Sequence, residues 1–228
     1  MNNKNIRINS LTDGVFAIIM TLLVLDVKVP EFIFTPTSNQ LSRAVWQLLP
    51  DMASFFISFV LLATYWMAHN YIFSSYIKKT DRLLNYLNMV FLMTVSFVPF
   101  SSHLLGSYPE TNFAISFYAV NIIIIGTTLY ILRQYLLNRP YLLQDSIDSK
   151  DIIHGTVRIF LPPVFAAIAV VVSYFNIPMS YILLTFPFVF NILPGGLNYL
   201  EYKLIHRPRI FINPNDNSKI HRPKASNS

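Results

Sequence analysis

Residues 7–26 read RINSLTDGVFAIIMTLLVLD, and this stretch decides the class of the protein. Its charged residues lie towards the two ends, while residues 14–25 carry no charge. The apolar run continues to Val29, so its length is close to the ~20 residues that a membrane-spanning helix needs. No cleavage pattern of small residues interrupts it, which predicts a retained helix over residues 11–29 rather than a cleaved signal peptide.

The same apolar character extends along most of the chain. Of its 228 residues, 54% are hydrophobic and 12% are charged, whereas an average soluble domain has about 25% charged residues. A soluble fold of this size could not bury so much apolar surface, so the composition predicts an all-α integral membrane protein, a six-helix bundle. The predicted spans are residues 11–29, 44–71, 83–105, 113–132, 157–175 and 179–200, which form one transmembrane domain (1–200) followed by a basic cytoplasmic tail (201–228).

The basic residues predict the orientation of these spans. Cytoplasmic segments of membrane proteins are enriched in lysine and arginine. If the N-terminus is cytoplasmic and there are six spans, fifteen of the seventeen basic residues lie inside, and only Lys28 and Arg43 lie outside. Five or seven spans would spoil this separation. We therefore expect a multi-pass protein of the cell (plasma) membrane with both termini in the cytoplasm.

The acidic residues favour the outer side. Asp26, Glu31, Asp51 and Glu110 fall in outer loops or helix ends, which gives the outer side a formal charge of −2 against +8 inside. A negative outer mouth would concentrate cations if a pore opened there. Ordinary loop charges far from any pore would explain the same pattern.

Several classes of function are disfavoured. No ionisable side chain lies near the middle of a predicted span, although proton-coupled pumps and carriers usually need one. The sequence also lacks a metal-ligand cluster, a glycine-rich phosphate loop, a nucleophile elbow and any cysteine, so we expect neither catalytic residues nor a cofactor. The tail could contact anionic lipid headgroups, and its sparse charges disfavour nucleic-acid binding.

The first predicted helix has a distinct face. At 100° per residue, six of its residues fall within about 40° of one line. Thr21 borders that line, and Asp26 lies about 80° round on the other side, near the outer end. An apolar helix packed among others, with Thr21 bonding the carbonyl of Ala17, would also explain the pattern. The six residues are Leu11, Gly14, Ile18, Leu22, Leu25 and Val29.

A second cluster is predicted at the cytoplasmic ends of the first two helices. Arg7 and Asp13 lie at this end of the first helix, and Trp66 and His69 lie at this end of the second, three residues apart on one face. A buried Asp13 would need Arg7 or His69 as a partner. Alternatively, Trp66 is an interfacial anchor and His69 belongs to a solvated helix end.

The stretch 7–26 resembles the first-helix signature of the endosomal and lysosomal potassium channel family called transmembrane protein 175, which includes shorter bacterial relatives. That signature reads Arg-x-x-x-Phe-Ser-Asp-Gly-Val-Phe-Ala-Ile, then Thr-Leu-Leu-x-Leu-Glu. This chain has Leu11, Thr12 and Asp26 where the signature has phenylalanine, serine and glutamate. The resemblance extends to Trp66-x-x-His69, Leu87-Asn88 and Pro99-Phe100, while the later helices match only in number and apolar character.

The resemblance implies a homotetramer whose first helices line a central pore. The family lacks the Thr-Val-Gly-Tyr-Gly filter of ordinary potassium channels, as does this chain. Its apolar constriction corresponds to Ile18, with Leu22 and Leu25 as further layers, and its hydroxyl linked to potassium preference corresponds to Thr21. Its network supporting the pore helix corresponds to Arg7, Asp13, Trp66 and His69.

We therefore expect a potassium-permeable cation channel without catalysis or cofactor. Potassium ions would pass Ile18 and Thr21, Asp26 would lie at the outer mouth, and the lipid bilayer would surround the tetramer. The alternatives are a proton-coupled carrier or proton leak pathway, and a structural membrane subunit that conducts nothing.

Overall fold

The apolar blocks of the sequence form helices throughout the part that the structure describes, residues 3–143 and 149–192 of a computed structural model. The fold of this part is all-helical apart from one isolated β-bridge between Ile77 and Leu143. In chain order the elements are α1 (Asn3–Leu22), the 3₁₀ helix η1 (Leu23–Asp26), α2 (Ser38–Gln47), α3 (Leu49–Ser75), α4 (Arg82–Val95), α5 (Val98–Ser107), α6 (Asn112–Leu137), the 3₁₀ helix η2 (Pro140–Leu142), α7 (Ser149–Ser173) and α8 (Ile177–Ile192).

Four helical segments of the described residues are long and apolar enough to cross a membrane: Arg7–Asp26, Leu49–Ser75, Arg82–Ser107 and Asn112–Leu137. The apolar parts of α7 and α8, Ile159–Ser173 and Ile177–Pro187, are shorter. The end of the predicted sixth span and the whole of the predicted tail, 201–228, lie outside the described residues. The count of six spans therefore stays a prediction.

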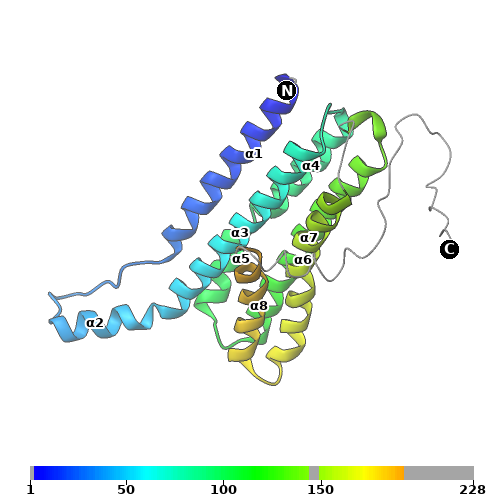
Figure 1. Ribbon diagram of the computed structural model, residues 1–228. Coiled ribbons are helices and arrows are strands. Elements are labelled where there is room, and N and C mark those ends of the chain that lie inside the picture. Colours follow the sequence, from blue (N-terminus) through cyan, green and yellow to red (C-terminus); the bar gives the residue numbers. More distant parts are fainter. Residues whose placement is uncertain (1–2, 144–148, 193–228) are drawn as a thin grey trace.

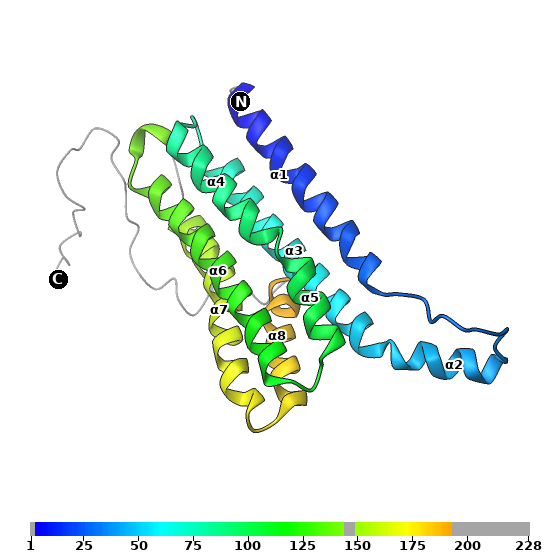
Figure 2. The ribbon, with the colours of Figure 1, turned by 180° about the vertical axis from the view of Figure 1, so that it is seen from behind.

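The predicted span 44–71 is two helices rather than one. α2 ends at Gln47 and α3 restarts at Leu49, with Pro50 in its first turn, where a proline costs little because no intrahelical donor is needed there. The N-terminus of α2 is closed by a capping box between Thr37 and Gln40. As Figures 1 and 2 show, α2 projects from the bundle as an arm.

The predicted span 83–105 is also divided, at Ser96 and Phe97 between α4 and α5. Pro99 lies in the first turn of α5 and has no amide to donate to the preceding turn, so the helix breaks here. At the end of α4 the carbonyl of Leu92 accepts from both the amide and the hydroxyl of Ser96, each at 2.9 Å.

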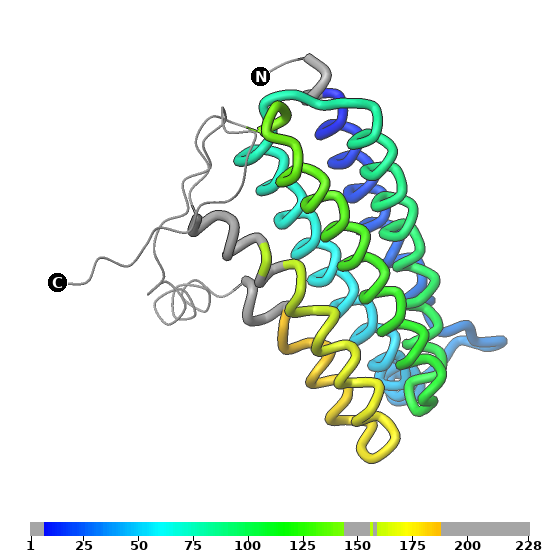
Figure 3. Tube along the Cα trace, turned by 90° about the vertical axis from the view of Figure 1, so that its right-hand side faces the viewer, coloured from blue at the N-terminus to red at the C-terminus, as the bar shows by residue number. Residues whose placement is uncertain are grey.

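The long helices run side by side in alternating directions (Figure 1). One end of the bundle, here called the N-end, holds the start of α1, the α3–α4 connection and the end of α6. The opposite end, here called the distal end, holds η1, the start of α3 and the α5–α6 turn. α1 packs against α3, α4 and α5 at one side of the bundle, and α7 lies at the other (Figure 3).

The interior of the bundle centres on α6. Tyr118 of α6 shares a 2.9 Å hydrogen bond with Ser58 of α3, and Asn121 donates to Ser101 of α5 at 2.8 Å. Gly126 allows α7 to approach closely, since a Cβ at this position would lie 2.3 Å from Cγ of Pro163. Small residues and interhelical hydrogen bonds are the usual means by which membrane helices pack, because lipid gives them no hydrophobic drive to associate.

At the N-end, Asp81 ties three elements together. Its carboxylate caps α4 by accepting from the Leu84 amide at 2.8 Å, and it also accepts from the hydroxyls of Tyr135 and Tyr141. Partial burial alone would raise the pKa of Asp81, but these hydrogen bonds, with Arg139 nearby, outweigh it and hold the pKa below the ordinary value of 3.8. The α3–α4 and α6–α7 connections are thus fastened to each other.

Candidate functional site

α1 attaches to the rest of the subunit by one face. Thr12, Phe16, Ile19 and Leu23 are each no more than 4% exposed, and their spacing of three or four residues places them on one side of the helix. The ring of Phe16 lies 6.0 Å from the ring of Phe91 in α4. These contacts fix the rotation of α1 about its axis and so decide which residues face outward.

The opposite face of α1 is uncovered. Ile18 is 60% exposed, Leu22 43% and Leu25 67%, and a Cβ at Gly14 would meet nothing within 4 Å. We call Leu11, Gly14, Ile18, Leu22 and Leu25 the outward stripe; they belong to the line of residues predicted from the periodicity. A subunit leaves so long an apolar stripe open only where lipid or another protein surface covers it.

Thr21 lies beside the outward stripe and is exposed. Its hydroxyl donates within its own helix, to the carbonyls of Ala17 at 3.0 Å and Ile18 at 2.8 Å. The Ala17 contact is the one that the packed-helix explanation requires. Because a hydroxyl has one donor and two acceptor lone pairs, this bonding commits the proton and leaves oxygen lone pairs directed away from the helix.

A buried polar chain joins three helices near the N-end. His69 Nε2 lies 2.7 Å from Asn88 Oδ1, and Asn88 Nδ2 donates to Thr12 Oγ1 at 3.2 Å. His69 is 2% exposed, and its ring stacks on those of Phe73 and Phe91, with centroids 4.2 and 5.4 Å away. The alternative of a solvated helix end for His69 is therefore wrong, because α1 and α4 cover it.

A second contact joins α1 and α3 at this level. The indole Nε1 of Trp66 donates to Oδ1 of Asp13 at 2.8 Å. Asp13 is exposed rather than buried, so the expected need for Arg7 or His69 as an ionic partner does not arise. Arg7 is also exposed, nearly two turns earlier in α1, and none of the described contacts brings it to the other three.

Two members of this network, Asn88 and Thr12, were not predicted from the sequence as parts of it. Asn88 was named only as part of the family resemblance, and Thr12 only as a departure from the signature. The available signal was polarity: Asn88 and His69 are amide and imidazole groups inside two predicted spans, and such groups usually bond to each other across helices.

At the distal end, Asp26 has a neighbour that was also not predicted from the sequence. His103 of α5 places Nδ1 3.8 Å from Oδ1 of Asp26. α5 approaches α3 closely here, since a Cβ at Gly106 would lie 2.6 Å from Oδ1 of Asp51. No sequence spacing relates η1 to α5, so this pair becomes visible only in the fold.

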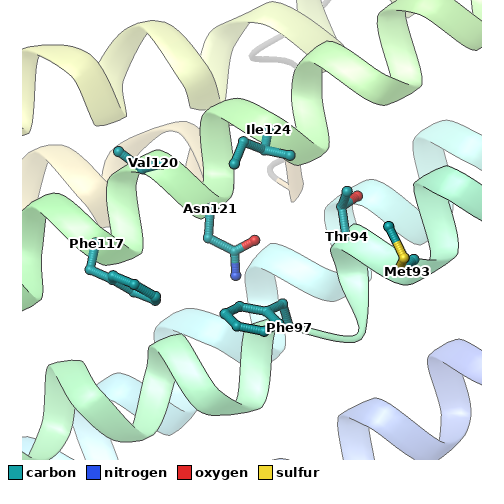
Figure 4. A pocket seen from close by; sticks show the side chains of 7 residues that line it. All are labelled: Met93, Thr94, Phe97, Phe117, Val120, Asn121 and Ile124. Carbon is teal, nitrogen blue, oxygen red and sulfur yellow. The ribbon is translucent and has the colours of Figure 1, made fainter.

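A pocket of about 430 Å³ lies at the break between α4 and α5 (Figure 4). The side chain of Asn121 points into it from α6, between apolar walls. Its lining contains no residue of α1, so the pocket is separate from the outward stripe. Within residues 3–143 and 149–192, no group of three or more His, Cys, Asp or Glu side chains is placed to hold a metal ion. The pocket is lined by Met93, Thr94, Phe97, Phe117, Val120, Asn121 and Ile124.

Comparison with protein families identifies a related group. The family model described as "Endosomal/lysosomal potassium channel TMEM175" matches residues 7–99, which include most of α1 and all of α2, α3 and α4. A potassium channel of Chamaesiphon minutus is 32% identical over 177 residues, covering 76% of this chain and 86% of the relative. A potassium channel of Streptomyces collinus is 27% identical over 182 residues, covering 78% and 86%.

Two further comparisons agree. The human endosomal/lysosomal proton channel TMEM175 is 28% identical over 186 residues, covering 78% of this chain but 36% of the longer human protein. The crystal structure of a lysosomal potassium-selective channel TMEM175 homolog from Chamaesiphon minutus superposes with a TM-score of 0.71 at 27% identity, covering 83% of this chain and 97% of that one. From the identity and coverage of these relatives, this chain belongs to the TMEM175 family of ion channels.

Proposed function

We propose that this protein is a homotetrameric, potassium-permeable cation channel of the plasma membrane, in which four copies of α1 surround a central pore. The observation that carries the proposal is the outward stripe, an uncovered apolar face on a helix whose other face is anchored in the subunit. Two bacterial relatives of similar length are named potassium channels. If four copies of α1 surround a fourfold axis, the outward stripe of each copy is covered by the stripes of the other three.

In this arrangement Ile18, Leu22 and Leu25 form successive apolar layers of the pore. Ile18 and Leu22 are separated by about 6 Å along the helix axis, since each residue rises 1.5 Å. A narrow ring of such side chains excludes water and thereby blocks ions until the ring widens. Opening would then be a rotation or splay of α1 that draws Ile18 away from the axis.

Thr21 places a polar hydroxyl group between the apolar layers of Ile18 and Leu22. Its proton is committed to the backbone, so four Thr21 oxygens would present acceptor lone pairs to a dehydrating cation. A potassium ion near Ile18 and Thr21 would replace part of its lost hydration with these oxygens, as in other channels that use oxygen ligands. We assign Thr21 the selectivity role on this ground.

The polar contacts at the N-end hold the pore helix in place. Asp13–Trp66 and Thr12–Asn88–His69 join α1 to α3 and α4, while Arg7 lies nearer the cytoplasmic surface, where none of the described contacts ties it to them. The distal end becomes the outer mouth, where Asp26 attracts cations. Both termini then lie in the cytoplasm, as the distribution of lysine and arginine predicts.

A proton channel is the second candidate, because the vertebrate relatives are named proton channels. One feature of this chain counts against it. α1 has no ionisable side chain between Asp13 and Asp26, so the proposed constriction offers no residue that could relay a proton. A pH jump across liposomes would separate proton flux from potassium flux, and the absence of any flux would favour a structural subunit.

The test is reconstitution of the wild-type protein and of Ile18→Asn in liposomes and planar bilayers. We expect potassium flux above sodium flux in the wild type, and a raised leak conductance in Ile18→Asn because a polar ring hydrates the constriction. Ile124→Asn is the matched control, since Ile124 is exposed near the middle of α6 and lies away from α1. An unchanged single-channel current in Ile18→Asn would contradict the pore assignment.

A further inference from the structure

Two titratable side chains meet at the distal end of the bundle. Nδ1 of His103 lies 3.8 Å from Oδ1 of Asp26, and the side chains are 45% and 35% exposed. Solvent on that side therefore reaches both groups, while their separation is short enough for a protonated imidazole to pair with the carboxylate.

The two groups are held near each other by backbone packing rather than by the pair itself. η1 is anchored by Leu23, which is 1% exposed. α5 is held against α3 by the close approach at Gly106 and by a 3.1 Å hydrogen bond from Ser102 to the carbonyl of Ser54. Protonation of His103 would therefore change the charge at this place without first having to move a helix.

Few other charges face the pair. Lys28 follows Asp26 along the chain, and Asp51 approaches from the first turn of α3. α1 contributes no charged residue between Asp13 and Asp26, and α6, which also packs on α5, carries none before Arg133. Because so few charges are present, protonation of His103 would change the net charge of this site substantially.

We propose that His103 is a functional residue of the outer mouth, and that its protonation lowers cation entry by neutralising Asp26. This inference rests on the proposed channel function. Histidine is the side chain that normally changes charge between pH 5 and 8. At higher external pH the Asp26 carboxylates of the four subunits attract cations to the mouth. At lower external pH each imidazolium cancels one of these negative charges.

The experiment measures inward single-channel potassium current in planar bilayers at low external salt, with the internal pH held constant. Between external pH values of about 8 and about 5.5, where histidine changes charge, we expect the wild-type current to fall about two- to fourfold. His103→Gln should keep the higher current at both pH values. Asp26→Asn should show the lower current at both.

Two controls sharpen the result. Ser107→Gln places the same side chain one turn further along α5, at an exposed position, and should keep the pH dependence of the wild type. At about 1 M external salt the Debye length is about 3 Å, so the pH dependence of the wild type should largely disappear.

The outcomes separate the two proposals. A fall in current that persists in His103→Gln would overturn the inference and point to protonation of Asp26 itself. A wild-type potassium current that does not depend on external pH would overturn the inference and leave the channel function standing. A wild-type protein that passes no potassium at either pH would overturn the channel function.

Discussion

α1 and α6 are equally apolar but are used in different ways. Their spans, Arg7–Asp26 and Asn112–Leu137, both have a mean hydropathy of 1.9. Of the residues in the apolar stretch of each span, 22% are buried in the first and 50% in the second. α6 packs against α4, α5 and α7, whereas α1 touches the bundle along the face that contains Phe16. Hydropathy therefore reports that a helix belongs in a membrane, and not whether its own subunit, lipid or another subunit covers it.

The largest predicted effect contrasts the two faces of α1. Phe16→Ala should lower the free energy of unfolding by about 2–4 kcal/mol, because it leaves a cavity against Phe91. Leu22→Ala on the outward stripe should change it by no more than about 0.5 kcal/mol. Thermal unfolding followed by tryptophan fluorescence measures both variants.

The same pair also tests the proposed pore. Leu22→Ala should raise conductance by widening an apolar layer, with the subunit fold intact. If Leu22→Ala destabilised the subunit as much as Phe16→Ala, the distinction between an anchored and an open face of α1 would be lost.

A smaller effect is expected from glycine substitutions in the two helices. Gly126→Ala in α6 should destabilise the fold by about 1–3 kcal/mol, because its Cβ would overlap Pro163. Gly14→Ala in α1 should leave the subunit as stable or raise its stability by up to about 1 kcal/mol, through better helix propensity. Unfolding curves and size-exclusion profiles compare the two variants.

Gly14→Ala would also refine the comparison at the level of the oligomer. Loss of the proposed tetramer with an intact subunit would show that a neighbouring copy packs closely on Gly14. Equal stability of Gly126→Ala and the wild type would contradict the close α6–α7 packing.

The smallest effect concerns acid stability, because the C-terminal part of α6 is held by a hydrogen bond from Tyr135 to the carboxylate of Asp81. The pKa of Asp81 is lowered in the folded chain, so its stabilising contribution is complete above the ordinary value of 3.8 and is lost as the pH falls below it. Tyr135→Phe removes the main hydrogen bond that lowers this pKa and should reduce the loss of stability between about pH 5 and about pH 2. Melting temperatures across this range provide the measurement, and an identical acid response in both proteins would rule out this role of Tyr135.

Much of the helical architecture could be predicted from the sequence, because runs of apolar residues and their flanking charges are local properties. The breaks at Leu48 and at Ser96–Phe97 were not predicted as helix ends. Pro50 and Pro99 were visible, but a proline in an apolar run can either bend a helix or begin a new one. The choice depends on neighbouring helices, which the sequence does not display.

The candidate site divides in the same way. The outward stripe follows from helical periodicity, because a single helix face depends on one segment of chain. Asp13 and Trp66 were placed at one depth, and the structure brings them into contact. Asn88 and His103 act through partners on other helices, so their roles depend on how the helices are rotated and inclined against one another.

The one-sided attachment of α1 has a consequence for how such a channel can diversify. Thr12, Phe16, Ile19 and Leu23 form the buried face of α1 and η1, and Asp13, Val15 and Met20 also contact the bundle. The outward stripe makes none of these contacts, so its residues are not constrained by packing within the chain. A chimera that keeps these seven positions and exchanges the rest of residues 11–25 should still pack on the same bundle. Natural variants could in this way alter what permeates while inheriting the remainder of the protein unchanged.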